Sequence, residues 1–378
     1  MKIRKVKVCL EDQIVMSPIE IEGDKISSFN DNDGPDLSNC YLIPGLIDQH
    51  IHGSASFDVM DGNAHGLEEM SKSLLEEGVT SFLGTTMTDS LDNINKAIES
   101  IYRLKSVQTQ GARIVGINLE GPFLSKEKCG AQRADALVRP SVEFVNSLNH
   151  LDLIKMATIA PELPGALEVI KYLTDRKIIA SIGHTNATYE EVVKGIKSGA
   201  HQITHGFNAM SEFNHHGVNA VGAMLLEDGL KVELICDGIH VSKEAIKLLY
   251  KLKGRENIIL ITDSMRAKYC LSGISELGGQ KVIVKGNEAR LENGVLAGSV
   301  LRLIDSVKNI MNFTSCSLPD AIYMASVNSA KNLGIYNQVG SIAIGKQADL
   351  VILDDNLEVL ATIIKGKVEY QKGEFLWK

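Results

Sequence analysis

The chain has 378 residues, which is enough for one large domain and a small one. Its 44% hydrophobic and 23% charged residues are typical of globular proteins, and its net charge of -8 argues against nucleic acid as the main partner. No apolar run approaches the ~20 residues of a membrane span, and the first residues lack the apolar core of a signal peptide. The six cysteines include no Cys-x-x-Cys pair. We therefore expect reduced thiols in a cytoplasmic protein that binds neither nucleic acid nor membrane.

Both ends of the chain have the pattern of short β-strands joined by turns. Residues 1–42 contain an alternating run from Ile3 to Leu10, followed by a strand, a turn and a strand between Ile19 and Ile26. Residues 341–378 contain similar runs at 348–353 and 363–369. Neither end could build a core alone, so we expect the two to pair into one small β-sandwich domain.

Residues 43–340 form the expected catalytic domain, in which strand-like apolar runs alternate with helical patterns. The strand-like runs are Leu42–Ile51, Thr80–Thr85, Ile114–Leu119, Ile154–Ala160, Ile178–Ile182, Gln202–Thr204, Lys231–Cys236 and Ile258–Thr262. The helical patterns include Leu67–Glu77, Leu91–Leu104, Gly165–Thr174, Tyr189–Lys197 and Lys243–Leu252. Eight βα units over roughly 290 residues predict an α/β fold of the TIM (β/α)8 barrel type. An open doubly wound sheet is the alternative, but the glycine-rich phosphate turn it favours after the first strand is missing.

The pattern changes after the eighth strand. Val282 to Leu296 predicts an inserted β-hairpin, with Asn293-Gly294 as a turn signal. Helices at 300–311 and 319–333 would then close the barrel.

Two histidines end the first barrel strand, in Asp48-Gln49-His50-Ile51-His52-Gly53. Alternate side chains of a strand share a face, so His50 and His52 can point at one spot and bind one divalent metal. Taken alone, they could equally be ordinary histidines at the end of a strand. The presence of further converging ligands decides between the two interpretations.

Four later side chains each follow a strand-like run. Glu120 precedes a Gly-Pro turn, His184 and His205 end the fifth and sixth runs, and Asp263 ends the eighth. Each has a purely structural alternative: a solvated turn residue, two hydrogen-bonded rim histidines and a helix N-cap. Because the carboxyl ends of barrel strands meet at one mouth, we expect all four to converge with the histidine pair.

Imidazoles and carboxylates are the ligands that suit zinc or ferrous iron. We therefore expect one or two such divalent ions at the barrel mouth. A centre of this kind lowers the pKa of bound water from ~16 to about 7, which gives hydroxide at neutral pH. Asp263 could take the proton of that water and pass it to a leaving nitrogen. The sequence thus predicts the hydrolysis of an amide or ester.

Short motifs along nearly the whole chain point to a known family. They are Pro44–Gly53, Leu119–Leu124, Gly130–Gln132, Ala160–Glu162, Gly183–Thr185, His205–Met210, Asp237–Val241, Thr262–Met265, Gly278–Gln280, Leu296–Ser299 and Gly340–Asp349. Together they resemble the N-acetylglucosamine-6-phosphate deacetylases of the amidohydrolase superfamily. The resemblance implies a homodimer that removes acetate from an N-acetyl amino-sugar 6-phosphate.

The resemblance also implies roles at matching positions. For the metal centre these are Glu120, His184 and His205 at the principal ion, His50 and His52 at a second ion, and Asp263, beside the metal, as the general base and then the acid. For the substrate they are Gln132 at the acetyl carbonyl, His240 at the sugar, and Asn208 with the Ala209 backbone N–H at the sugar-phosphate end.

One stretch departs from the family pattern. After Asn208-Ala209-Met210 the family usually has His-His-Arg-Glu-Pro-Gly, whose arginine reaches a phosphate, commonly across a dimer interface. This chain has Asn214-His215-His216-Gly217-Val218-Asn219, so that His216 replaces the arginine. Arginine is the better phosphate clamp, and histidine is only partly charged at pH 7. Either His215 and His216 hold the phosphate differently, or the substrate differs, or the pair belongs to a surface loop.

Other functions stay open beside the hydrolysis of N-acetylglucosamine 6-phosphate. The substrate could be the galactosamine isomer. Alternatively, the enzyme could be another amidohydrolase, such as a dihydroorotase-like cyclic amidase or a deacetylase of unphosphorylated amides. A catalytically silent scaffold is the third possibility, and the intact ligand set argues against it. The Asn208-Ala209-Met210 context favours a sugar substrate.

Overall fold

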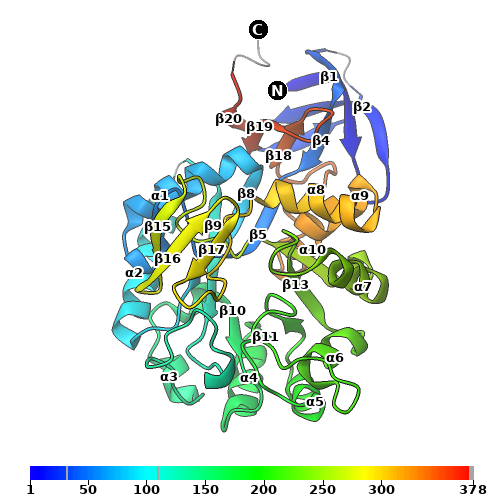
Figure 1. Ribbon diagram of the computed structural model, residues 1–378. Coiled ribbons are helices and arrows are strands. Elements are labelled where there is room, and N and C mark those ends of the chain that lie inside the picture. The colour runs from blue at the N-terminus through cyan, green and yellow to red at the C-terminus, as the bar shows by residue number, and fades with distance from the viewer. Residues whose placement is uncertain (31–32, 109, 374–378) are drawn as a thin grey trace.

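Two β-sheets organise the protein, as a computed structural model shows. The structure describes residues 1–30, 33–108 and 110–373. One sheet has eight strands and is surrounded by helices, and the other has seven strands from the two ends of the chain (Figure 1). In Figure 1 the blue N-terminal strands and the red C-terminal strands lie together, above the helix-covered barrel.

The terminal sheet joins both ends of the chain through hydrogen bonds. Its strands, in spatial order, are β20 (Lys367–Gln371), β19 (Val359–Ile364), β18 (Leu350–Leu353), β4 (Asp36–Pro44), β1 (Lys2–Cys9), β2 (Ile14–Glu22) and β3 (Lys25–Ser28). Strand β4 connects the two ends, because it pairs antiparallel with β18 and parallel with β1. Inward-facing apolar side chains such as Val6, Ile19 and Ile352 form a separate core.

A small β domain built from both termini is therefore confirmed. It differs from the expected sandwich in one respect, since its strands form one connected sheet. The proposed limits of 1–42 plus 341–378 stay a prediction, and residues 374–378 lie outside the described part of the chain.

The run Leu42–Ile51, which the sequence predicts as one strand, is in fact two strands. Strand β4 ends at Pro44 in the terminal sheet, and β5 begins at Leu46 in the barrel. Gly45 between them presses against Thr80, where an added Cβ would lie 2.1 Å from the Thr80 hydroxyl oxygen. The chain can turn from one sheet into the other only because this residue has no side chain.

The eight-stranded sheet is a nearly closed parallel barrel, as predicted. Its strands, in spatial order, are β14 (Ile258–Ile261), β13 (Lys231–Ile235), β12 (Gln202–Ile203), β11 (Ile179–Ile182), β10 (Ile154–Ile159), β9 (Arg113–Glu120), β8 (Val79–Thr86) and β5 (Leu46–Ile51). The first and last strands, β5 and β14, meet at their carboxyl ends. There the Asp263 N–H donates a hydrogen bond to the His50 carbonyl (2.8 Å), and the His52 N–H donates one to the Ser264 carbonyl (2.9 Å). These two bonds bring the predicted site residues of β5 and β14 side by side.

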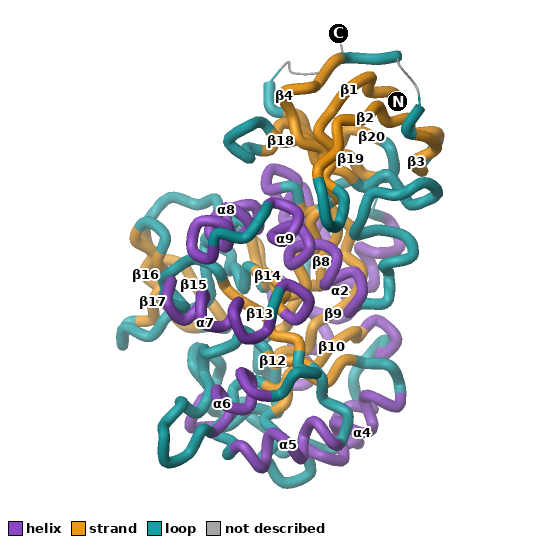
Figure 2. Tube along the Cα trace, turned by 90° about the vertical axis from the view of Figure 1, so that its right-hand side faces the viewer, coloured by secondary structure: helices purple, strands orange, loops and turns teal. Residues whose placement is uncertain are grey.

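Helices cover the outside of the barrel (Figure 2). They are α1 (Ala64–Ser73), α2 (Leu91–Val107), α3 (Val142–Asn146), α4 (Ala166–Asp175), α5 (Tyr189–Lys197), α6 (Asn219–Leu226), α7 (Lys243–Lys253) and α8 (Leu303–Thr314), followed by α9 (Leu318–Ile322) and α10 (Asn328–Asn332) with one π-helical turn between them. In α2, Ile94, Ile98 and Ile101 recur at helical spacing and are buried. No helix in the described residues has both the length and the apolar character of a membrane span.

The helical patterns located in the sequence do not include α3 and α6. Helix α3 has only five residues, too few to show a period. Helix α6 is apolar on most faces, with Ala220, Val221, Ala223 and Met224 all buried, so its sequence has no amphipathic alternation.

The insertion after β14 is a three-stranded sheet. Strands β15 (Gly273–Leu277), β16 (Gln280–Lys285) and β17 (Glu288–Leu291) pair antiparallel. The predicted hairpin omitted β15, because all of its residues except Leu277 are partly or fully exposed and polar residues interrupt it. Asn293-Gly294 forms the predicted turn after β17: the Leu291 N–H donates to the Val295 carbonyl (2.8 Å), and Arg290 bridges Leu296 antiparallel beyond the turn. Leu277, Val282 and Val284 pack with Met87 and Met265, which fixes the insertion over the barrel mouth.

Candidate active site

Side chains from five barrel strands and the loops after them meet at the barrel mouth. They are His50, His52, Glu120, His184, His205 and Asp263, all buried. The Glu120 carboxylate lies at the centre of the group. Its Oε1 is 3.1 Å from His184 Nε2 and 3.0 Å from His205 Nε2. The two imidazole nitrogens are also 3.0 Å from each other, so one ion between them could be bound by all three side chains.

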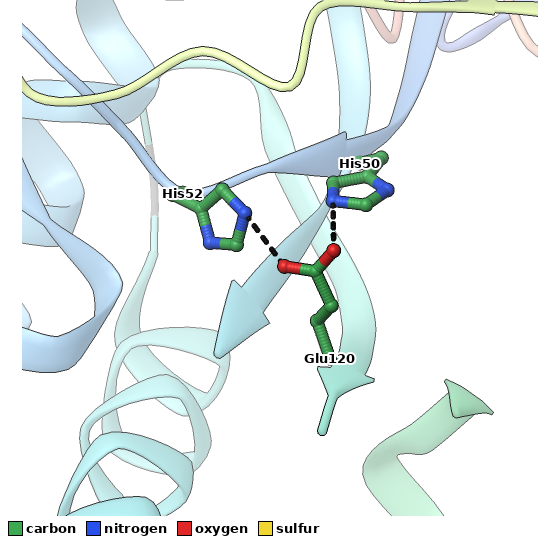
Figure 3. A group of neighbouring side chains, drawn as sticks. All are labelled: His50, His52 and Glu120. Atoms are coloured by element: carbon green, nitrogen blue, oxygen red, sulfur yellow. Dashed lines mark ion pairs between the residues drawn. The ribbon is translucent and has the colours of Figure 1, made fainter. Parts of the chain in front are cut away.

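The first-strand histidines approach the same carboxylate from the other side. Figure 3 shows the rings of His50 and His52 facing Glu120. His52 Nε2 lies 3.1 Å from Glu120 Oε2 and 3.2 Å from Asp263 Oδ1. His50 Nε2 is 3.6 Å from Glu120 Oε1 and 3.5 Å from Asp263 Oδ1. Glu120 therefore lies between two potential metal sites.

Three of these residues have a left-handed backbone. The φ angles are 46° at His184, 29° at His205 and 49° at Asp263. Such angles are uncommon for residues with a side chain and cost about 1–3 kcal/mol each, so the surrounding structure must hold them. Each follows directly or closely after its strand, where this turn directs the side chain into the barrel mouth.

Hydrogen bonds orient three of the imidazoles. The acceptors for Nδ1 are the Glu233 carboxylate for His50 (2.9 Å), the Thr85 carbonyl for His52 (3.2 Å) and the Lys128 carbonyl for His184 (2.8 Å). Because these oxygens only accept, each Nδ1 carries a hydrogen, and in the neutral ring this leaves the Nε2 lone pair available to a metal ion. His50 Nε2 is buried without a hydrogen-bond partner among the described residues. An unpaired nitrogen aimed at two carboxylates fits a metal ligand.

The charge balance of the group also fits a cation. Burial by itself would raise the pKa of Glu120, but the charge of His50 and hydrogen bonds from His184 and His205 hold it well below its ordinary value. Asp263 is likewise held low, against its burial, by His50 and His52. Burial lowers the pKa of His52, yet the same two carboxylates raise it overall to about 9. Both carboxylates are therefore negative, and their field favours positive charge between them.

A cavity of about 410 Å³ opens above this group. Its volume suits a small molecule. The six buried side chains described above could hold a metal ion and form the metal-binding group. Five of them line the cavity: His52, Glu120, His184, His205 and Asp263. The rest of the wall includes Met87, Lys128, Gln132, Asn208, Ala209, His240, Leu277 and Leu296.

The structure brings four of the predicted substrate residues to this cavity. Gln132 Nε2 donates to Glu120 Oε2 (2.6 Å), and its carbonyl oxygen accepts from the Thr88 N–H (2.7 Å). Asn208 is fixed by bonds from its amide to the backbone carbonyls of His205 and Gly206, and Ala209 follows it with a φ of 50°. His240 lines the cavity, with its Nδ1 2.6 Å from the Asp237 carboxylate.

His215 and His216 are placed differently. Both are exposed, and neither is part of the cavity wall. They occupy a tight turn in which Asn214 and Gly217 exchange backbone hydrogen bonds of 3.2 and 3.0 Å. The turn holds the two imidazoles side by side on the surface, with ring centroids 3.8 Å apart. Their role as phosphate ligands stays a prediction.

Sequence reasoning missed Glu233, a fully buried carboxylate on β13. Besides the His50 ring, it accepts hydrogen bonds from the side-chain amides of Gln49 (2.8 Å) and Gln202 (3.1 Å). The signal was a charged residue inside the apolar strand Lys231–Ile235, because a buried charge requires such partners.

Replacing Glu233 with Gln should weaken metal binding at the His50 position by about 10- to 100-fold. An amide at this position cannot accept from His50, Gln49 and Gln202 at once, so the His50 ring loses its fixed orientation. Titration of the metal-free protein with zinc would measure the effect, with the exposed Glu212→Gln as the matched control. Unchanged affinity in Glu233→Gln would show that the ring is held by packing alone.

A barrel with four histidines and two carboxylates at its carboxyl-end mouth, below a cavity of small-molecule size, is typical of enzymes whose centre could hold a metal ion. Comparison with known proteins narrows this class. Residues 41–368 match the Amidohydrolase family, and the chain belongs to this family.

Relatives within the family share most of their length with this chain. The N-acetylglucosamine-6-phosphate deacetylase of Bacillus subtilis (strain 168) is 44% identical, over 88% of this chain and 85% of that protein. An N-acetylgalactosamine-6-phosphate deacetylase of Escherichia coli O157:H7 is 33% identical, over 86% of this chain and 87% of that protein. The crystal structure of the N-acetylglucosamine-6-phosphate deacetylase from Thermotoga maritima superimposes with a TM-score of 0.92 at 37% identity, covering 98% of this chain and 100% of that one.

Proposed function

We propose that this protein is a metal-dependent deacetylase that converts N-acetylglucosamine 6-phosphate into glucosamine 6-phosphate and acetate. The observation that carries the proposal is the convergence of four histidines and two carboxylates at the floor of the cavity. The 44% identity to the Bacillus subtilis deacetylase supports the substrate.

The donor set suits zinc or ferrous iron. Glu120, His184 and His205 would hold the principal ion, and His50 and His52 a second one. When bound, a metal at this position supplies the positive charge that lowers the pKa of a water molecule and polarises a carbonyl group.

Asp263 is the proposed general base and then acid. Its carboxylate lines the cavity, and its lowered pKa keeps it ionised at neutral pH. It accepts a proton from the water that attacks the acetyl carbon, and it donates that proton to the sugar nitrogen as the C–N bond breaks. Because Asp263 returns the proton that it accepted, it ends the reaction ionised, as it began.

The remaining cavity residues would position the substrate. The Gln132 amide reaches Glu120 Oε2 and so lies beside the reacting group, where it can donate to the acetyl oxygen. Asp237 holds the His240 ring by Nδ1, which leaves Nε2 available for a sugar hydroxyl. Asn208 and the Ala209 backbone N–H would contact the sugar-phosphate end, and we further propose His215 and His216 as alternative phosphate contacts if a partner subunit brings them to the site.

Acetate release from the purified, metal-loaded protein tests the proposal. N-acetylglucosamine 6-phosphate, its galactosamine isomer and unphosphorylated N-acetylglucosamine should be compared at equal concentration. We expect the first to give the highest kcat/KM. The galactosamine isomer is the second candidate, because of the Escherichia coli relative. No acetate from any of the three would refute the proposal.

We also propose that the enzyme acts as a homodimer in the cytoplasm. Six free cysteines are consistent with a reducing compartment. Phe213, exposed at 57%, precedes the His215-His216 turn, and Leu226, exposed at 60%, ends helix α6, which follows the turn; both offer apolar surface for a second copy. Sedimentation at micromolar concentration would test the dimer, and a monomer under these conditions would refute it.

A further inference from the structure

The phosphate of the proposed substrate needs a positive partner inside the cavity. The family's arginine is replaced by His216, which lies in an exposed turn outside the cavity wall. Among the described residues that line the cavity, Lys128 is the one residue with a permanent positive charge. The other charged groups in the wall, apart from the histidines, are the carboxylates of Glu120, Asp263 and Glu127.

Lys128 is held in a fixed position relative to the metal-binding group. It ends a short 3-10 turn, Lys126–Lys128, that follows β9. Its carbonyl accepts from His184 Nδ1 (2.8 Å), and its N–H donates to the Ser125 carbonyl (3.1 Å). The Ser125 N–H in turn donates to the His184 carbonyl (2.9 Å). These bonds hold the segment against His184. They use only backbone atoms of Lys128, so the Lys128 side chain can be substituted without breaking them.

The ammonium group is available for a ligand. Lys128 is half-buried, and within the described residues its side chain forms no ion pair. The neighbouring Glu127 carboxylate accepts from the Ser125 hydroxyl (2.8 Å) and lies at the exposed rim. A cation without a partner in a cavity wall favours an anionic group on the molecule that enters.

We propose that Lys128 binds the phosphate of the amino-sugar phosphate from within the same subunit. This inference rests on the proposed function and names the residue that makes the site selective for phosphorylated sugars. Lysine binds phosphate as a point charge, so it can replace the missing arginine without the bidentate geometry. Because the acetamide must reach the metal-binding group, the phosphate at the other end of the sugar meets another part of the cavity wall, and the long, flexible Lys128 side chain can extend to it.

Steady-state kinetics of Lys128→Gln test this assignment. With N-acetylglucosamine 6-phosphate, we expect KM to rise about 10- to 100-fold with little change in kcat, since a charge-assisted hydrogen bond is lost. With unphosphorylated N-acetylglucosamine, kcat/KM should stay as in the wild type. Lys128→Arg should keep most of the preference for the phosphorylated sugar, because it keeps the charge. The exposed Lys126→Gln is the matched control and should behave as wild type.

Several outcomes would overturn the assignment. One is a Lys128→Gln variant that behaves like Lys126→Gln. Another is an equal loss of kcat/KM for both sugars, which would indicate a general structural role. A rise in KM in the His215→Gln/His216→Gln double variant, with none in Lys128→Gln, would assign the phosphate to the surface turn.

Direct binding separates this inference from the proposed function. Calorimetric titration of the metal-loaded wild type and Lys128→Gln with glucosamine 6-phosphate needs no catalysis. If wild type releases no acetate from any substrate but binds this sugar phosphate about 10- to 100-fold more tightly than Lys128→Gln does, the proposed reaction fails and the role of Lys128 stands. Equal binding by the two proteins would refute the role of Lys128.

Discussion

Asp263→Asn should lower kcat for acetate release by about 10²- to 10⁴-fold while the protein stays folded. Asparagine has nearly the same shape as aspartate, but its amide cannot accept the proton from the attacking water or return it to the leaving nitrogen. KM should change little, because the cavity keeps its form. Acetate release at saturating N-acetylglucosamine 6-phosphate would measure the effect.

Two controls make this result specific. Asp228→Asn removes an exposed carboxylate in the loop between α6 and β13, outside the cavity wall, and should have wild-type activity. The metal content of Asp263→Asn should be measured alongside, because Asp263 Oδ1 lies 3.2 Å from His52 Nε2. A loss of metal that matches the loss of activity would assign Asp263 to the metal centre and not to proton transfer.

Glu120→Gln should abolish metal binding and lower activity by about 10³-fold or more. Its two carboxylate oxygens face different histidines, Oε1 toward His184 and His205 and Oε2 toward His52. Removing this one charge therefore weakens both potential ion positions. Elemental analysis of the purified variant would give the metal content, and acetate release would give the activity.

The number of ions can be tested with a second variant. His50→Asn/His52→Asn removes only the first-strand pair and should bind one ion fewer than wild type. Chelation of the wild type should abolish activity, and added zinc or ferrous iron should restore it. Full activity after chelation, or an unchanged metal content in Glu120→Gln, would contradict a metal-dependent reaction.

The positions of the barrel strands were predicted to within one or two residues, apart from the first run. Buried parallel strands are continuous apolar runs, and amphipathic helices between them make the alternation easy to detect. Ile258–Thr262, for example, corresponds to β14 at Ile258–Ile261. The prediction failed where local sequence has no period: in the five-residue α3, in the uniformly apolar α6 and in the exposed β15.

The metal-binding group was predicted for a similar reason. In a parallel barrel all strands end at one mouth, so His50, Glu120 and Asp263 could be placed together from their strand ends alone. The residues that orient these side chains could not be predicted from strand ends. Glu233 lies inside β13 and reaches His50 only because the barrel brings their strands to a common interior.

The sequence by itself determined the fold class and the six side chains at the barrel mouth, because strand period and strand ends are local properties of the chain, and its short motifs indicated the family by resemblance. Only the tertiary structure decided which charges enter the cavity. It placed Lys128 in the wall and the His215-His216 turn on the surface. The direction of a loop side chain depends on backbone hydrogen bonds to distant residues, such as that between Lys128 and His184, and these contacts form only when the barrel closes.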